Sequence, residues 1–381
     1  MQSESLLIVA AEESSAAYAK RLLHILEKEK PNLKCFGVGN KAMEDMGFER
    51  LGKSEDMAVI GIVEVIKHYG LIRKVFYNLI DEAVKRKVKV VLLIDYPDFN
   101  MRLAKELKKR NIKVVYYISP TVWAWRQNRI HNIKKYIDKM LLIYPFEVDF
   151  YKKHEMKYEF VGHPLLDEMN TDLLDQDKID TQKLKMGLEK KDTIIGLMPG
   201  SRRSEIKFHL SEQLEALKLL QKRIPNLYGA LLLAPSLEKH EIQQYLTESP
   251  ENFIILQDEP FKMLQAVDAV LVASGTATLV VALMQKPMVI MYKLNAVTAW
   301  LAKKIVKGVK YFGIVNLLYN QEVAPEMFQE KVNAKDLSDE MLKVLEPKNA
   351  NEQIEKWKNI PNLLGKTGVA ERVVRALDEY F

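Results

Sequence analysis

The chain has 381 residues, of which 48% are hydrophobic and 28% charged, and its formal net charge at pH 7 is +6. This length predicts two domains with full cores, and the composition excludes a disordered chain, a membrane-spanning helix of ~18 apolar residues and, since Cys35 is the only cysteine, an internal disulfide. The N-terminus lacks the basic segment of a signal peptide, and the basic residues are not gathered with aromatic platforms, so neither secretion nor nucleic-acid binding is expected.

Strands and helices alternate through the first half of the chain. Residues 5–10 form an apolar strand, 14–30 a helix and 33–38 a second strand. This spacing is typical of right-handed βαβ units and predicts a parallel sheet. Further strands are expected at 88–94, 112–118, 139–144 and 158–161, and a helix at 145–153.

The segment 57–79 is rich in large apolar residues that are interrupted by Lys67, His68, Arg73 and Lys74. One interpretation is a pair of amphipathic helices packed on the sheet. The other is a partly exposed apolar surface with basic flanks, suited to acyl chains or a bilayer face. The pattern fits both.

Two carboxylates and an amide, Asp95, Asp98 and Asn100, follow the strand at 88–94. Ligands of open α/β sheets bind beyond the carboxyl ends of the strands, which makes Asp98, and next Asp95, the candidate acid or base. The alternative is that Asp98 or Asn100 caps a helix starting at Met101.

The strand at 112–118 ends in a loop with Trp123, Trp125 and Arg126. The tryptophans could stack on a sugar and the arginine could bind phosphate, or the tryptophans could belong to the core beneath the loop. More basic side chains follow at Arg129, His131, Lys134 and Lys135.

A polar, charged stretch at 168–191 predicts a domain boundary. Strands are expected beyond it near 193–198, 227–234, 252–256, 268–273 and 287–292. We therefore predict domains at 1–167 and 168–350, followed by a helical segment at 351–381 that packs back on the first domain and is broken at Ile360–Pro361.

Two turns in the second half have the pattern of an anion site. Pro199, Gly200, Ser201 and Arg202 join a strand to a helix that begins near Ser204. Such a turn presents unpaired backbone N–H groups to a phosphate, and arginine adds donors. A second small-residue turn, at 274–276, follows another strand, so the two turns predict one crevice for a phosphorylated ligand.

Taken in order, these motifs resemble those of the lipid-A-disaccharide synthase family, and the resemblance covers nearly the whole chain. The motifs are DYPDFN (95–100), SPTVWAWR (119–126), PFE (145–147), VGHPL (161–165), PGSRRSEI (199–206) and SGTATL (274–279), extended by GVG (37–39), MAVIGIVEV (57–65) and NLL (316–318).

The resemblance implies an α/β protein with two Rossmann-like domains facing across a cleft, the GT-B fold. It implies an inverting glycosyltransferase that joins UDP-2,3-diacylglucosamine to 2,3-diacylglucosamine 1-phosphate, without metal or cofactor, as a peripheral protein of the cytoplasmic membrane's inner face. A homodimer is a further expectation. It assigns catalysis to Asp98 or Asp95. It assigns substrate binding to Glu12, Ser14, Asn100, Trp123, Arg126, Pro199, Gly200, Ser201, Arg202, Glu205, Ser274, Gly275, Thr276, Asn316 and Glu322.

Three departures from the family pattern leave alternatives open. The first loop reads AEESSA at 11–16 instead of the usual Gly-Glu-Ala-Ser-Gly-Asp, Val280 replaces a glutamate placed to hold the ribose, and Val315 replaces a proline. A catalytically weakened paralogue, or an enzyme for another UDP-sugar such as an epimerase, also fits. An epimerase needs no acyl-binding surface, so segment 57–79 discriminates between them.

Overall fold

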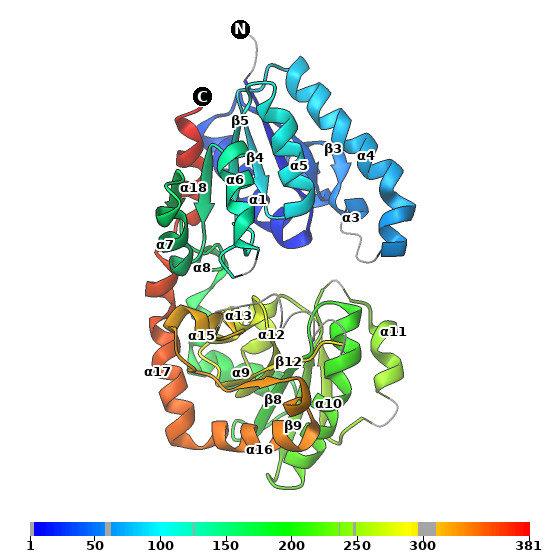
Figure 1. Cartoon of the computed structure of the whole chain (residues 1–381). Coiled ribbons are helices and arrows are strands. Elements are labelled where there is room, and N and C mark those ends of the chain that lie inside the picture. Colours follow the sequence, from blue (N-terminus) through cyan, green and yellow to red (C-terminus); the bar gives the residue numbers. More distant parts are fainter. Residues whose placement is uncertain (1–3, 58–61, 125, 236, 247–248, 296–309) are drawn as a thin grey trace. The chain divides into compact units, whose positions relative to one another are not determined.

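The structure, a computed structural model, describes residues 4–57, 62–124, 126–235, 237–246, 249–295 and 310–381, with the side chains of 62–68 left out (Figure 1). The chain divides into two compact units. Unit 1 contains Met1–Asp167 and Leu364–Phe381, and unit 2 contains Glu168–Leu363. The expected segment 351–381 is thus shared, because its first part belongs to unit 2.

Unit 1 is built on a seven-stranded, all-parallel sheet with the strand order β3-β2-β1-β4-β5-β6-β7. Its strands are β1 (Ser5–Ala10), β2 (Lys34–Gly39), β3 (Glu49–Lys53), β4 (Val90–Ile94), β5 (Lys113–Tyr117), β6 (Lys139–Leu142) and β7 (Tyr158–Phe160). Its helices are α1 (Glu13–Glu29), α2 (Lys41–Glu44), α3 (Ser54–Met57), α4 (Ile62–Lys85), α5 (Pro97–Lys108), η1 (Gln127–Arg129), α6 (Ile130–Tyr136), α7 (Pro145–Lys153), α8 (Leu165–Glu168, which reaches the unit boundary) and α18 (Val369–Asp378).

Alternating side chains of this sheet build two separate cores. Leu7 and Val9 pack with α4, α5, α6 and α7, whereas Leu6 and Ile8 pack with α1 and α18. Successive residues of a strand point to opposite faces, so a strand buried on both sides is apolar throughout. The end of the chain therefore completes one face of the first sheet.

Unit 2 has a six-stranded parallel sheet with the order β10-β9-β8-β11-β12-β13. Its strands are β8 (Thr193–Met198), β9 (Leu227–Leu232), β10 (Phe253–Leu256), β11 (Ala269–Ala273), β12 (Met288–Tyr292) and β13 (Glu326–Phe328). Its helices are η2 (Thr171–Leu174), α9 (Gln176–Lys185), α10 (Arg203–Gln221), α11 (Lys239–Ile242), η3 (Gln243–Tyr245), α12 (Pro260–Leu264), α13 (Ala277–Leu283), α15 (Ile314–Tyr319), η4 (Gln329–Lys331), α16 (Ala334–Leu345) and α17 (Pro347–Leu364).

Two sequence expectations about helix ends are wrong. Helix α5 begins at Pro97 and not at Met101, because proline without an N–H fits the first helical position. Helix α17 runs through Pro361 to Leu364. Buried Ile360 holds the last turn in the core, and the positive φ angles of Gly365 and Gly368 end the helix region instead.

Candidate active site

Each sheet has a point where the order of its strands reverses, and the predicted site loops start there. In unit 1 this point lies between β1 and β4, where Ala10 pairs with Ile94. In unit 2 it lies between β8 and β11, where Met198 pairs with Val272. Connections leave neighbouring strands in opposite directions at such a point, which opens a crevice at their carboxyl ends.

In unit 1 the loop after β4 has an unusual backbone. Asp95 and Tyr96 both adopt left-handed conformations, with φ angles of 49° and 51°. The Asp95 carbonyl accepts hydrogen bonds from the Tyr116 hydroxyl (2.5 Å) and from Asn100 Nδ2 (2.7 Å), while the Tyr96 hydroxyl donates to the Met57 carbonyl (2.6 Å). Non-glycine residues in this region cost energy and persist where the surroundings hold them, often at functional sites.

This backbone presents Asp98 to solvent on the first turn of α5. Its carboxylate lies 3.6 Å from the Arg129 guanidinium. The pKa of the Tyr96 hydroxyl is raised by burial and then by the negative charges of Glu12 and Asp98, so these two carboxylates lie near the same ring. Glu12 follows β1 and Asp98 follows β4, so both carboxylates lie at the carboxyl ends of neighbouring strands.

Asn100 is buried under the loop after β4, and Glu12 and Ser14 lie at the start of α1. Asn100 is fully buried and binds the carbonyls of Ile94 and Asp95, so neither it nor Asp98 caps a helix at Met101 as the alternative had it. Glu12 is the residue before α1, and Ser14 is exposed on its first turn.

An aromatic cluster lies at the ends of β5 and β6. Trp123 packs on Phe146 with ring centroids 4.7 Å apart, Phe146 stacks on Tyr144 at 5.0 Å, and His163 lies 5.2 Å from Tyr144. Burial lowers the pKa of His163 to about 3, so this imidazole is neutral. Trp123 is thus partly a packing residue; Arg126 is exposed beside it, and Trp125 lies outside the described residues.

Besides Tyr380 Oη near the end of the chain, three buried polar atoms of unit 1 have no hydrogen-bond partner among the described residues: Ser15 Oγ, Asn100 Oδ1 and Trp123 Nε1. Each follows one of the strands β1, β4 and β5 at its carboxyl end. Buried polar groups are nearly always paired in native proteins, so unpaired ones at one edge of a sheet are typical of a ligand site. No sequence pattern pointed to Ser15 as a site residue.

Glu147 is a further group that the sequence reasoning assigned no role. It is almost fully buried, its Oε2 accepts a hydrogen bond from the Tyr144 N–H (3.1 Å), and burial raises the pKa of its carboxyl to about 8. This carboxyl is therefore largely protonated at neutral pH.

Segment 57–79 contains both core residues and exposed apolar residues. Met57, Val75 and Leu79 are core residues, whereas Tyr69, Leu71 (41% exposed) and Tyr77 lie on the surface of α4. The Arg73 guanidinium lies 5.8 Å from the Tyr77 ring. Residues 58–61 and the side chains of 62–68 lie outside the description. In the part of the chain that is described, no helix is long and apolar enough to cross a bilayer.

In unit 2 the turn between β8 and α10 is closed by its own glutamate. Gly200 has a φ of 117°, and a Cβ there would lie 2.2 Å from Glu205 Oε2, so only glycine fits. That same oxygen accepts the N–H groups of Ser201 (2.9 Å) and Arg202 (3.2 Å). The expectation that these two donors are unpaired is therefore wrong, because Glu205 takes the place of an anion.

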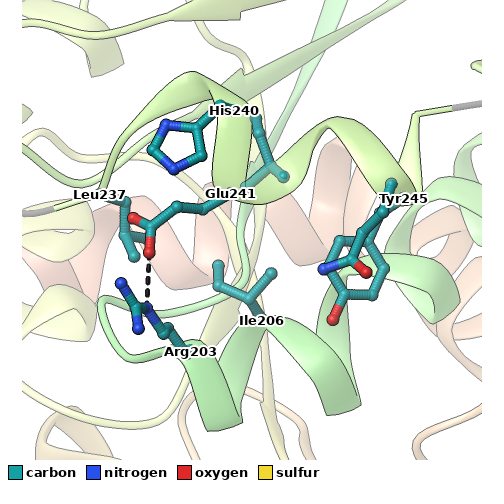
Figure 2. A pocket seen from close by; sticks show the side chains of 8 residues that line it. Arg203, Ile206, Leu237, His240, Glu241 and Tyr245 are labelled. Atoms are coloured by element: carbon teal, nitrogen blue, oxygen red, sulfur yellow. Dashed lines mark hydrogen bonds and ion pairs between the residues drawn. The ribbon is translucent and has the colours of Figure 1, made fainter.

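The two arginines of the turn differ in their partners. Arg203 Nε lies 2.5 Å from Glu241 Oε1, at a cavity of about 340 Å³ between α10 and the segment α11–η3 (Figure 2). Arg202 lies 3.8 Å from Glu205. Its positive charge also lowers the pKa of Tyr292, which burial raises overall. Arg202 therefore lies near the carboxyl ends of β8 and β12, whereas Arg203 is paired with Glu241 of α11.

The second turn, after β11, lies open. Ser274 Oγ donates to the Phe312 carbonyl (3.1 Å), and a Cβ built on Gly275 would contact nothing within 4 Å. Thr276 is exposed. Val280, where the family pattern has an acid, is 7% exposed within α13.

Asn316 and Glu326 fix the segment that follows. Asn316 Oδ1 accepts the N–H groups of Val323 and Ala324, and its Nδ2 donates to Glu326 Oε1 (2.7 Å). Glu326 in turn accepts the N–H groups of Phe312 and Gly313. The buried Asn316 amide is thus occupied by the chain itself, whereas Glu322 is exposed.

An aromatic stack that the sequence reasoning missed lies beside Ser274. Phe312 stacks on Phe328 with centroids 5.1 Å apart and planes 4° apart, and Tyr292 stacks on both. Phe312 is a large exposed hydrophobic residue. Exposed aromatic faces of this kind are common where sugars or bases bind.

Comparisons with known proteins agree on one family. The profile of the lipid-A-disaccharide synthetase family matches residues 6–372. Lipid-A-disaccharide synthases from Trichlorobacter lovleyi and Geobacter sulfurreducens are 38% and 37% identical over 96% and 97% of this chain, covering 95% and 96% of those proteins. The enzyme of that name from Myxococcus xanthus is 34% identical over 98% of the chain and 97% of its own length.

Solved structures support the fold. A putative UDP-N-acetylglucosamine 2-epimerase from Listeria monocytogenes has a TM-score of 0.68 at 10% identity, covering 100% of this chain and 97% of that one. A spinosyn rhamnosyltransferase has a TM-score of 0.59 at 12% identity, covering 98% and 100%. The two-domain GT-B architecture expected from the sequence is confirmed.

Proposed function

This chain belongs to the lipid-A-disaccharide synthase family and is a glycosyltransferase of lipid A biosynthesis, and we propose that it joins UDP-2,3-diacylglucosamine to 2,3-diacylglucosamine 1-phosphate with inversion. The assignment is based on Asp98, which lies on the first turn of α5 at the switch point of unit 1, and on Arg202, which precedes α10 at the switch point of unit 2. The shared name of the relatives favours this reaction over transfer from another UDP-sugar.

The proposed reaction needs one proton transfer and one leaving group. The 6-hydroxyl of the acceptor attacks the anomeric carbon of the donor, its proton passes to the Asp98 carboxylate, and the bond from the anomeric carbon to the phosphate oxygen breaks. UDP leaves with that electron pair. A positioned base contributes ~10²–10⁴-fold to such a step.

Stabilisation of the departing diphosphate falls to Arg202. The amide donors of the turn are bound to Glu205, whereas the Arg202 guanidinium lies 3.8 Å from that glutamate and has no closer ion pair with a described residue. A charge-assisted hydrogen bond to a phosphate oxygen is about twice as strong as a neutral one. The Phe312–Phe328 stack beside Ser274 offers an apolar face to the donor.

The acyl chains and the membrane surface are assigned to α4. Its exposed Tyr69, Leu71 and Tyr77 lie beside Arg73, which is the combination that favours an anionic lipid interface. This surface supports a peripheral position on the inner face of the cytoplasmic membrane.

The direct test incubates the purified protein with both lipid substrates and follows disaccharide 1-phosphate and UDP by mass spectrometry. We expect Asp98→Asn to lose ~10²-fold or more in turnover with little change in substrate affinity. Glu106→Gln is the matched control, since Glu106 pairs with Lys109 and Arg110 at the other end of the same helix. No product from the wild type would refute the assignment, and full activity of the Asp98 variant would move the base to Asp95.

A further inference from the structure

A histidine on α10 joins the Pro199–Arg202 turn to the end of β12. His209 is 1% exposed. Its Nδ1 lies 2.8 Å from the Pro199 carbonyl oxygen, and its Nε2 accepts the backbone N–H of Lys293 at 3.0 Å. Both ring nitrogens are therefore bound to the backbone of segments that follow strands β8 and β12.

These contacts require one tautomer. A carbonyl oxygen only accepts, so Nδ1 carries the proton and donates to Pro199, while Nε2 must be unprotonated to accept from Lys293. Burial lowers the pKa of the imidazole, which favours this neutral form. The neutral ring therefore accepts a hydrogen bond from the Lys293 N–H and donates one to the Pro199 carbonyl.

The Lys293 end of this link is itself anchored. Lys293 Nζ binds Glu212 Oε1 (2.9 Å) and the Val332 carbonyl (3.0 Å), and the other oxygen of Glu212 accepts the N–H of Ala334 (3.1 Å). Glu212 stands three residues after His209 on α10. The Lys293 side chain is therefore held by Glu212 of α10 and by the Val332 carbonyl just before α16, and the Lys293 backbone N–H is the donor to His209.

The Pro199 end is the sensitive one. The Pro199 carbonyl belongs to the peptide that precedes Gly200, whose φ of 117° sets the direction of the turn. Rotation of that peptide would swing the N–H groups of Ser201 and Arg202 away from Glu205 and carry the Arg202 side chain with them.

We propose that His209 is a positioning residue for the donor nucleotide: its ring fixes the Pro199–Gly200 peptide so that Arg202 faces the diphosphate. This inference rests on the proposed function, which places the diphosphate beside Arg202. His209 does not touch the reacting atoms, and it acts on the binding of UDP more than on the chemical step, which depends on Asp98 in the other unit.

The competing view is that His209 is only a core residue, and α10 supplies a control for it. Gln213, one turn further on, is fully buried and donates to the Leu271 carbonyl (2.9 Å), away from the turn. Gln213→Leu removes the buried contacts of Gln213 Nε2 with the Leu271 carbonyl and with Met291 Sδ, and His209→Leu removes the two backbone contacts of the His209 ring. A core role predicts equal effects of the two variants on UDP binding.

The experiment measures UDP affinity by calorimetry, melting temperature and the separate KM and kcat values. We expect His209→Leu to weaken UDP binding about 3- to 10-fold, the range of one lost hydrogen bond, and to raise KM more than it lowers kcat. Gln213→Leu should melt earlier with wild-type UDP affinity. His209→Asn, whose amide can reach Pro199 from the Nδ1 position, should bind UDP within ~2-fold of the wild type, because the donor is kept.

Three results would overturn the proposal: wild-type UDP affinity in His209→Leu, an equal loss in Gln213→Leu, or an Asn variant as weak as the Leu variant. If His209→Leu does not fold, nitrogen NMR of the wild type decides, with the signal assigned by its loss in His209→Asn. We expect the Nδ1–H tautomer and a shift of Nδ1 on adding UDP, and the opposite tautomer or an unmoved signal contradicts us. A wild type that binds no UDP would refute the nucleotide site itself, which is a separate outcome.

Discussion

Replacing Glu147 with glutamine should make the protein more stable at pH 8 and change it little at pH 4. Glu147 is buried, and its pKa is raised from 4.5 to about 8 by burial. Below pH 4.5 the carboxyl is protonated in both the folded and the unfolded chain, so it imposes no penalty. Above that value the unfolded chain ionises while the folded protein keeps its proton, so the free energy of unfolding falls until about pH 8 and is constant beyond it.

The size of this loss follows from the interval between the two pKa values. One pH unit corresponds to about 1.4 kcal/mol, so the roughly 3.5 units between 4.5 and 8 give at most about 5 kcal/mol. Glutamine cannot ionise, and its Oε1 can still accept the Tyr144 N–H that Glu147 Oε2 accepts at 3.1 Å. The variant should therefore escape the loss while keeping the contact that begins α7.

Urea denaturation at pH 5, 6, 7 and 8 measures the difference directly. The stability of Glu147→Gln relative to the wild type should grow steadily across this series. Glu155→Gln is the control, because Glu155 lies exposed beyond the end of α7. Parallel pH profiles for the wild type and Glu147→Gln would show that Glu147 ionises normally and would refute the reasoning.

Three further predictions concern the ligand sites. Arg202→Ala should weaken UDP binding by ~1.5–3 kcal/mol, whereas Arg203→Ala, whose guanidinium is bound to Glu241, should leave it unchanged; equal losses by calorimetry would remove the distinction. Leu71→Glu should reduce flotation with anionic liposomes at an unchanged melting temperature, and unfolding instead would make Leu71 a core residue. Val280→Glu should lower the melting temperature without tightening UDP binding, because the new carboxylate would be buried; tighter binding would show that the ribose lies at this position.

The buried strands were predictable because their apolar runs satisfy a sheet covered on both faces. The run 193–198 reappears residue for residue as β8, and 5–10 as β1. Strands β3 and β13 escaped prediction, since ERLGK and EMF carry charged or mixed side chains at the sheet edges. An edge strand pairs with only one neighbour and is partly exposed, so its sequence does not need an apolar run, and hydrophobicity does not reveal the strand.

The site was predictable as a set of loops but not as a set of contacts. Strand ends give the position of Asp98 and Arg202 along the chain. Two contacts depend on side-chain geometry that strand positions do not reveal. Glu205 accepts the Ser201 N–H of the turn before α10, and the Asn316 amide binds Ala324 and Glu326. The sequence shows His209 as a polar residue among the apolar positions that α10 buries, but this pattern does not indicate which groups His209 binds.

The return of α18 to the first sheet has a consequence for how the protein is made. Val373 and Leu377 belong to the same core as Leu6 and Ile8, yet the roughly 200 residues of unit 2 are synthesised between them. At ~5–20 residues per second, a nascent chain waits roughly 10–40 s with α1 but not yet α18 on one face of its first sheet. Unit 2 can close its core during that interval, so the part that begins the chain is the last to finish folding, and its apolar face is the stretch that a chaperone on the ribosome would need to shield.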